Sequence, residues 1–137
     1  MTEKSSRKKS KSPDPRELDV EISFLEGLIK RDPTYVDALQ LLGDDYTKRG
    51  RIEEGLRVDQ QLSQLEPQNP TVFYNLACSL SLAGKLDEAA QAVESAIDLG
   101  YRDFKWLARD PDLKALRKHP HYERLREKMR RLKIDID

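Results

Sequence analysis

The sequence repeats itself at an interval of thirty-four residues. A helical unit of about this length cannot bury its own apolar face, so it stacks on copies of itself. The interval therefore predicts an all-α array of helical hairpins, and the surface of such an array binds other chains. The matching positions are Leu42-Gly43 with Leu76-Ala77, Gly50 with Gly84, Glu54 with Glu88, and Leu65 with Leu99.

The composition favours a soluble intracellular protein. The chain has 137 residues, of which 36% are charged and 37% hydrophobic, enough for one domain with a modest core. No apolar run approaches the roughly 20 residues of a membrane-spanning helix, and the charged N-terminus lacks the apolar segment of a signal peptide. The single cysteine, Cys78, fits a reducing compartment. We therefore expect a cytoplasmic protein that does not enter a membrane.

The net charge of zero hides an acidic body between two basic ends. Acids outnumber bases from Glu17 to Tyr101, whereas bases dominate before Glu17 and again from Arg102 to Lys133. This distribution favours basic partners for the body, or contact between the body and its own tail. Ordinary solvated helix faces are the simpler interpretation.

The N-terminal segment, residues 1–14, has no apolar periodicity and is rich in Ser, Lys and Pro, so we expect a disordered basic tail. The domain of residues 15–137 then opens with a helix whose apolar residues recur at helical spacing until Asp32-Pro33. Pro33 lies one interval before Pro67. Residues 15–33 are thus predicted to form the second half of a unit that lacks its first half.

Two complete units follow, over residues 36–69 and 70–103. In the first unit Leu39, Leu42 and Tyr46 share one helix face, and Gly50 lies at the turn, where a helix end often needs a left-handed residue. The spacing Leu39-x2-Leu42-Gly43-x2-Tyr46 and its copy Phe73-x2-Leu76-Ala77-x2-Leu80 resemble the tetratricopeptide repeat (TPR) family.

The resemblance implies a short TPR-type helical-hairpin solenoid whose first helices line a concave groove. Three positions depart from the family pattern: Gly55 replaces a small Ala, Asp59 an aromatic residue, and Tyr101 the closing Pro. We expect Asp59 to loosen the first unit locally unless a cation, such as Arg57 or one from a neighbouring helix, pairs with it.

Residues 104–134 are predicted to form degenerate or capping helices. Asp103-Phe104 and Asp110-Pro111 each have the pattern of an N-cap followed by a helix start, and a basic amphipathic helix begins near Pro120. This stretch also resembles the ends of some bacterial TPR proteins. A terminal helix with a polar outer face is what a solenoid needs.

The sequence offers no recognisable catalytic, cofactor or metal site. It has no phosphate-binding glycine loop, His119 and His121 lack a Cys partner, and Cys78 has no nearby His. For the two histidines a helix-cap or surface role is the simpler interpretation. We therefore predict a non-enzymatic adaptor or scaffold without a cofactor.

The predicted function is binding of a partner peptide or helix, of basic character, in the concave groove. Tyr74 has the size and polarity of a binding anchor, and Asp37 and Asp44 favour Lys or Arg on the ligand. Any one of these residues could equally be an ordinary solvated helix residue. The candidate groove residues are Asp37, Gln40, Asp44, Lys48, Thr71, Tyr74, Asn75 and Cys78.

Two alternatives remain open at this point. Nucleic-acid or anionic-surface binding by the basic tail and the C-terminal helix is less favoured, because Tyr122 alone interleaves the basic residues of that helix. Self-association through the exposed ends of the solenoid is the second alternative, since the helix at 15–31 lacks a covering helix.

Overall fold

The computed structural model describes residues 14–136, with side chains described as far as Lys133. This range is helical and contains no strand, so the predicted all-α class is confirmed, and the predicted disordered tail lies almost wholly outside it. None of its helices combines the length and apolar character needed to span a bilayer. The elements are α1 (Pro15–Arg31), α2 (Val36–Lys48), α3 (Ile52–Leu65), α4 (Pro70–Leu82), α5 (Leu86–Asp98), α6 (Phe104–Leu107), the 3-10 helix η2 (Pro111–Leu113), α7 (Lys114–Arg117) and α8 (Tyr122–Ile136).

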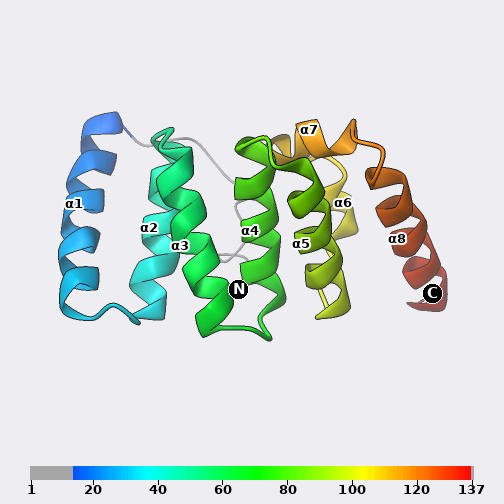
Figure 1. Ribbon diagram of the computed structural model, residues 1–137, viewed down its shortest axis with the longest axis horizontal. Coiled ribbons are helices and arrows are strands. Elements are labelled where there is room, and N and C mark those ends of the chain that lie inside the picture. The colour runs from blue at the N-terminus through cyan, green and yellow to red at the C-terminus, as the bar shows by residue number, and fades with distance from the viewer. Residues whose placement is uncertain (1–13, 137) are drawn as a thin grey trace.

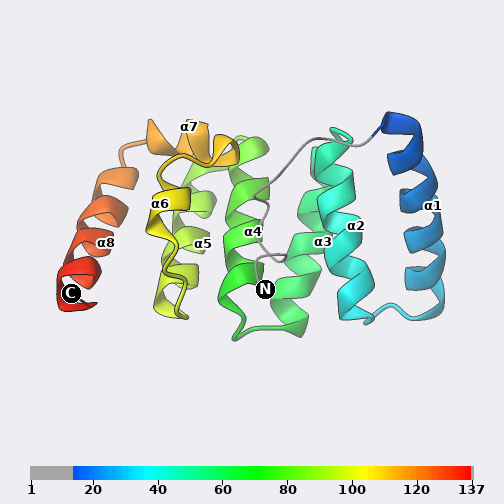
Figure 2. The ribbon, with the colours of Figure 1, turned by 180° about the vertical axis from the view of Figure 1, so that it is seen from behind.

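The helices stand side by side in a row in which α1 to α4 each contact the next helix along the chain (Figure 1). Seen from behind, α2, α4 and α6 lie on the near face, with α3 and α5 behind them (Figure 2). The short helices α7 and η2 contact α4, and α8 packs against α5 at the far end. The arrangement gives one face built from α2 and α4 and another built from α3 and α5.

The turns between paired helices are set by two glycines one interval apart. Gly50 and Gly84 have φ angles of 87° and 80°, which L side chains rarely adopt. After Gly50 the N–H of Arg51 donates to the carbonyl of Tyr46 at 2.8 Å, and after Gly84 the N–H of Lys85 donates to that of Leu80 at 2.9 Å. Both turns therefore close a helix with the same hydrogen bond. The thirty-four-residue interval of the sequence is reproduced in backbone geometry.

The predicted caps in the C-terminal region are confirmed. The Asp103 side chain accepts a hydrogen bond from the N–H of Trp106 at 3.2 Å, at the start of α6. The Asp110 side chain accepts one from the N–H of Asp112 at 3.0 Å, at the start of η2. These short helices begin where capping residues satisfy backbone donors.

Two apolar clusters form the core. One joins α1, α2, α3 and the start of α4, and includes the predicted face of Leu39, Leu42 and Tyr46. The other joins α4 and α5 to the C-terminal helices and buries Leu80 and Val93. Because the clusters are consecutive, each helix is held mainly by its neighbours in the row.

Asp59 is not a weak point of the first unit. Its side chain is buried on α3 and accepts a hydrogen bond from the hydroxyl of Ser79 on α4, at 2.5 Å. A neutral hydroxyl on the next unit is thus one partner of the Asp59 carboxyl. Gly55 also has a clear role. A Cβ there would lie 3.0 Å from Oγ1 of Thr47, so the glycine lets α2 and α3 approach closely.

Candidate functional site

The structure separates the eight predicted groove residues into an open set and a covered set. On α2, Asp37 and Lys48 are exposed, and Gln40 and Asp44 are half-buried. On α4, Thr71 and Asn75 are half-buried, whereas the side chains of Tyr74 and Cys78 have no exposed surface. The predicted groove is thus open along α2 and closed over the middle of α4.

The C-terminal segment closes the α4 part of the groove. Tyr101 stacks on the ring of Tyr74, with centroids 4.3 Å apart and planes 10° apart. The Tyr74 hydroxyl donates to Oδ2 of Asp110 at 2.6 Å. Tyr74 is therefore not an exposed anchor for a partner, and that prediction is wrong. The residues after α5 turn back onto α4 because an aromatic ring and a buried carboxylate of this segment fit there.

Asp110 is the polar centre of this covered region. Its Oδ2 lies 3.6 Å from Sγ of Cys78, and its Oδ1 accepts the N–H of Asp112. Burial raises the pKa of Tyr74 far above its ordinary value. The phenol therefore stays neutral and donates a hydrogen bond to Asp110. Cys78, predicted to line the groove, is instead enclosed with this hub. The hub attaches the C-terminal segment to α4, which is a structural role.

The α2 face remains open and carries an apolar residue that is not among the predicted groove residues. Leu41 is 51% exposed. It lies four positions after Asp37 and three before Asp44, so helical spacing places it in the same stripe as these acids and Lys48. The interval also identifies it, since it is the counterpart of Asn75 in the second unit. An exposed leucine bordered by charged and polar side chains is a suitable contact for a protein partner.

Polar contacts join α1 to the back of this face. The Tyr46 hydroxyl donates to Glu26 at 2.5 Å, and Nε of Arg49 lies 2.8 Å from Asp19. Asp45 is almost fully buried, and its carboxyl hydrogen bonds with that of Glu21. Burial and this second carboxyl raise the pKa of Asp45 to about 7.

Two groups of side chains among the described residues have the chemistry of metal ligands, although neither has favourable geometry. His119 and His121 each place Nε2 against Oδ1 of Asp87, at 3.2 and 3.3 Å. Nδ1 of His119 accepts the N–H of His121 at 3.2 Å, which leaves its proton on the Nε2 that a metal would need. In the second group, Cys78, Asp110 and Asp112, both carboxylate oxygens of Asp110 already accept hydrogen bonds.

The basic residues of α8 are largely engaged by carboxylates. Arg124 and Lys128 both bond Glu94 of α5, at 2.9 and 3.0 Å, and Lys128 lies 2.7 Å from Asp98. The nearby cations hold the pKa of Glu94 below its ordinary value. These contacts fasten α8 to α5. Within α8 itself the pairs are Arg126 with Glu123, and Arg130 and Arg131 with Glu127.

The chain is similar to part of a longer protein, a chloroplastic protein of Arabidopsis thaliana. The two are 37% identical over 86 residues. The match covers 61% of this chain and 26% of the Arabidopsis protein. No family model matches the chain. The comparison thus relates this chain to a segment of a larger protein.

Proposed function

We propose that this chain is a TPR-type solenoid that binds a peptide or helix of a partner protein along the α2 face, without catalysis. The proposed solenoid consists of a half unit, two complete units and capping helices. Its support is the recurrence of one turn geometry at Gly50 and Gly84, together with contacts between consecutive helices. Each unit in such an array is completed by its neighbours.

The exposure of Leu41 is the observation that carries this proposal. The leucine lies between Asp37 and Asp44 on an open helix face, with Gln40 and Lys48 beside it. An apolar centre within a polar rim is the usual form of a protein-binding surface. The two acids favour a partner with Lys or Arg next to its apolar contact, because complementary charges orient the encounter.

Anion binding by α8 has weaker support. Arg124 and Lys128 are both bonded to Glu94. A phosphate would have to compete with these carboxylates, and their negative charge reduces the positive potential around α8.

We also propose a cytoplasmic location for this chain, whereas the related Arabidopsis protein is chloroplastic by name. Imaging the fluorescently tagged chain in its source cell tests the location.

Affinity capture from source-cell lysate tests the binding proposal. The full-length chain is compared with a Leu41→Asp/Asp44→Lys variant of the α2 face and with a Glu53→Lys control on exposed α3 surface. We expect at least one protein to be captured by the wild type and the control, and lost by the α2 variant. Equal capture by all three chains would refute the assignment. Tyr74 is left intact, because its truncation would open the core.

A further inference from the structure

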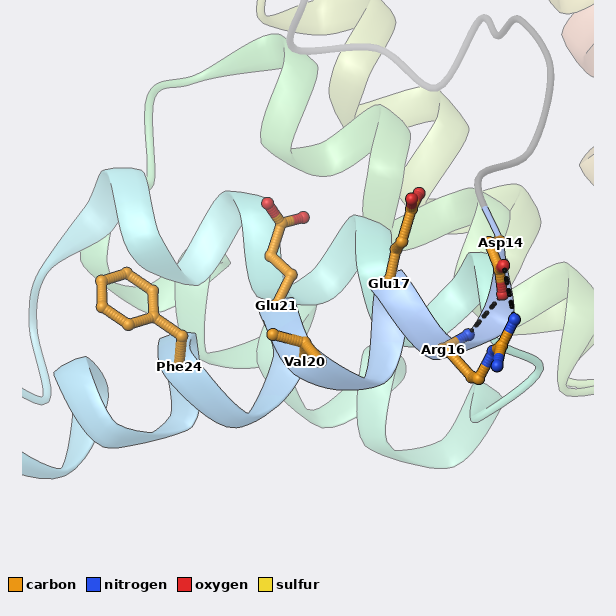
Figure 3. A pocket seen from close by; sticks show the side chains of 6 residues that line it. All are labelled: Asp14, Arg16, Glu17, Val20, Glu21 and Phe24. Atoms are coloured by element: carbon orange, nitrogen blue, oxygen red, sulfur yellow. Dashed lines mark hydrogen bonds and ion pairs between the residues drawn. The ribbon is translucent and has the colours of Figure 1, made fainter.

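The outer face of α1 carries the most exposed large apolar side chains among the described residues. Val20 is 71% exposed and Phe24 is 63% exposed. Glu17, Val20, Glu21 and Phe24 follow one another at helical spacing and line one shallow depression, together with Asp14 and Arg16 (Figure 3). The face is therefore an apolar stripe with carboxylates beside it.

The repeat register explains why this stripe is bare. Phe24 lies one interval before Val58 and two intervals before Ala92. Val58 and Ala92 are buried, in clusters that include residues of the preceding helices α2 and α4 respectively. In both complete units this position is thus buried in a cluster to which the first helix of the hairpin contributes. Within the described residues no helix precedes α1, so the same position is left open.

The same register indicates the charge of an occupant. Glu21 takes the position of Gly55 and Ala89, two small residues that are buried in the complete units. At Gly55 an added Cβ would lie only 3.4 Å from the carbonyl oxygen of Gly43 on the covering helix. A helix over α1 therefore meets a carboxylate where the complete units have a small residue. Glu17, one turn earlier and exposed, adds a second carboxylate on that side.

Other acids of α1 are directed to α2 and to the turn that follows it. Asp19 is paired with Arg49, and Glu26 accepts from Tyr46 and lies 3.6 Å from Arg51. Their charge is thus largely compensated within the molecule. Glu21 also interacts with Asp45 of α2, but it lines the depression beside Val20 and Phe24, as Glu17 does.

We propose that this face of α1 binds an amphipathic helix of a partner protein, with Lys or Arg beside its apolar stripe, in the place that the first helix takes in the two complete units. The site is separate from the α2 face and does not depend on it. A symmetric pairing of α1 with α1 of a second copy would bring Glu17 and Glu21 against like charges, which disfavours that occupant. A basic helix covers the apolar stripe and compensates both acids.

Two synthetic peptides test this proposal. Both have 13 residues, the length of α4, and keep the apolar spacing of Phe73, Leu76, Ala77 and Leu80. One carries Lys at its remaining positions and the other carries Glu. Binding of each labelled peptide to the full-length chain is followed by fluorescence anisotropy at moderate salt. We expect the Lys peptide to bind about tenfold or more tightly than the Glu peptide, because the carboxylates attract one and repel the other.

Variants locate the bound peptide. A Val20→Ser/Phe24→Ser chain should bind the Lys peptide about tenfold or more weakly, since two apolar contacts are lost. Glu17→Lys should also weaken it. Glu53→Lys, the matched charge reversal on exposed α3 surface, should leave binding unchanged. All four positions are exposed, so circular dichroism should show the same fold for each variant.

Several results would overturn the α1 proposal. They are absence of binding at about millimolar Lys peptide, equal binding of both peptides, or unchanged binding by the α1 variant. Loss of binding in a Leu41→Ser variant alone would place the peptide on α2, which leaves the proposed function intact and refutes this inference. A wild-type dimer in sedimentation that Val20→Ser/Phe24→Ser dissociates would assign the face to a second copy instead.

Discussion

Replacement of Asp45 by Asn should stabilise the protein in a pH-dependent manner. The Asp45 carboxyl is 4% exposed and hydrogen bonds with Glu21 across the interface of α1 and α2. Its pKa is raised from 3.8 to about 7 by burial and by the neighbouring carboxyl. Between these pH values the unfolded chain releases a proton that the folded chain keeps. Stability therefore falls as pH rises through this window, and the loss is complete above about pH 7.

The size of the effect follows from the pKa difference. At 1.36 kcal/mol per pH unit, a rise from 3.8 to about 7 corresponds to about 4 kcal/mol. Part of this is recovered by relaxation of the pair with Glu21, so we expect a gain of about 2–4 kcal/mol for Asp45→Asn at about pH 8. The Asn amide can donate to Glu21 at every pH. At about pH 4 the variant and the wild type should differ by less than about 1 kcal/mol.

Urea denaturation followed by far-UV circular dichroism, at about pH 4 and about pH 8, measures both values. Asp37→Asn is the matched control, because Asp37 is an exposed acid on the same helix. Glu21→Gln should reproduce part of the gain at high pH, and the double variant should be less than additive. A loss of stability in Asp45→Asn at both pH values would refute the raised pKa of Asp45.

Three further predictions concern other features of the fold. Asp110→Ala should cost about 3 kcal/mol in chemical denaturation, because a charged hydrogen bond is lost and the buried Tyr74 phenol is left unpaired; an effect below about 1 kcal/mol would remove Asp110 as the polar hub. Gly84→Ala should lower stability by about 1–2 kcal/mol, because φ is 80° there, and an unchanged midpoint would contradict the turn geometry. Gly27→Ala should increase the free energy of unfolding by about 0.5–1 kcal/mol and so raise the thermal midpoint, since a Cβ there meets nothing within 4 Å. A lower midpoint would show an unrecognised contact.

The parts of the fold that depend on local chemistry could be predicted from the sequence. Glycine geometry predicts the turn at Gly50, and capping preference predicts the caps at Asp103 and Asp110. Helical spacing predicts that Leu39 is buried. Each of these depends on residues a few positions apart. The repeat interval then places the same features in the second unit.

The candidate site was predicted less well, because it depends on contacts distant in sequence. Tyr74 was expected to be exposed by analogy with other first helices, yet Asp110 and Tyr101 cover it. No periodicity in α4 indicates that a later segment returns to it. Leu41 and Phe24 could have been found from the interval, since their counterparts in the next unit are Asn75 and Val58. What the interval cannot give is which of these positions remains open.

Photo-crosslinking from the α2 face tests whether a partner protein binds there. A photoreactive amino acid is placed at Leu41 and, as the control, at exposed Glu53 on α3 in the full-length chain in its source cell. We expect a discrete crosslinked protein from position 41 and none from position 53. No adduct at position 41, or the same adducts from both positions, would contradict a partner-binding site on α2.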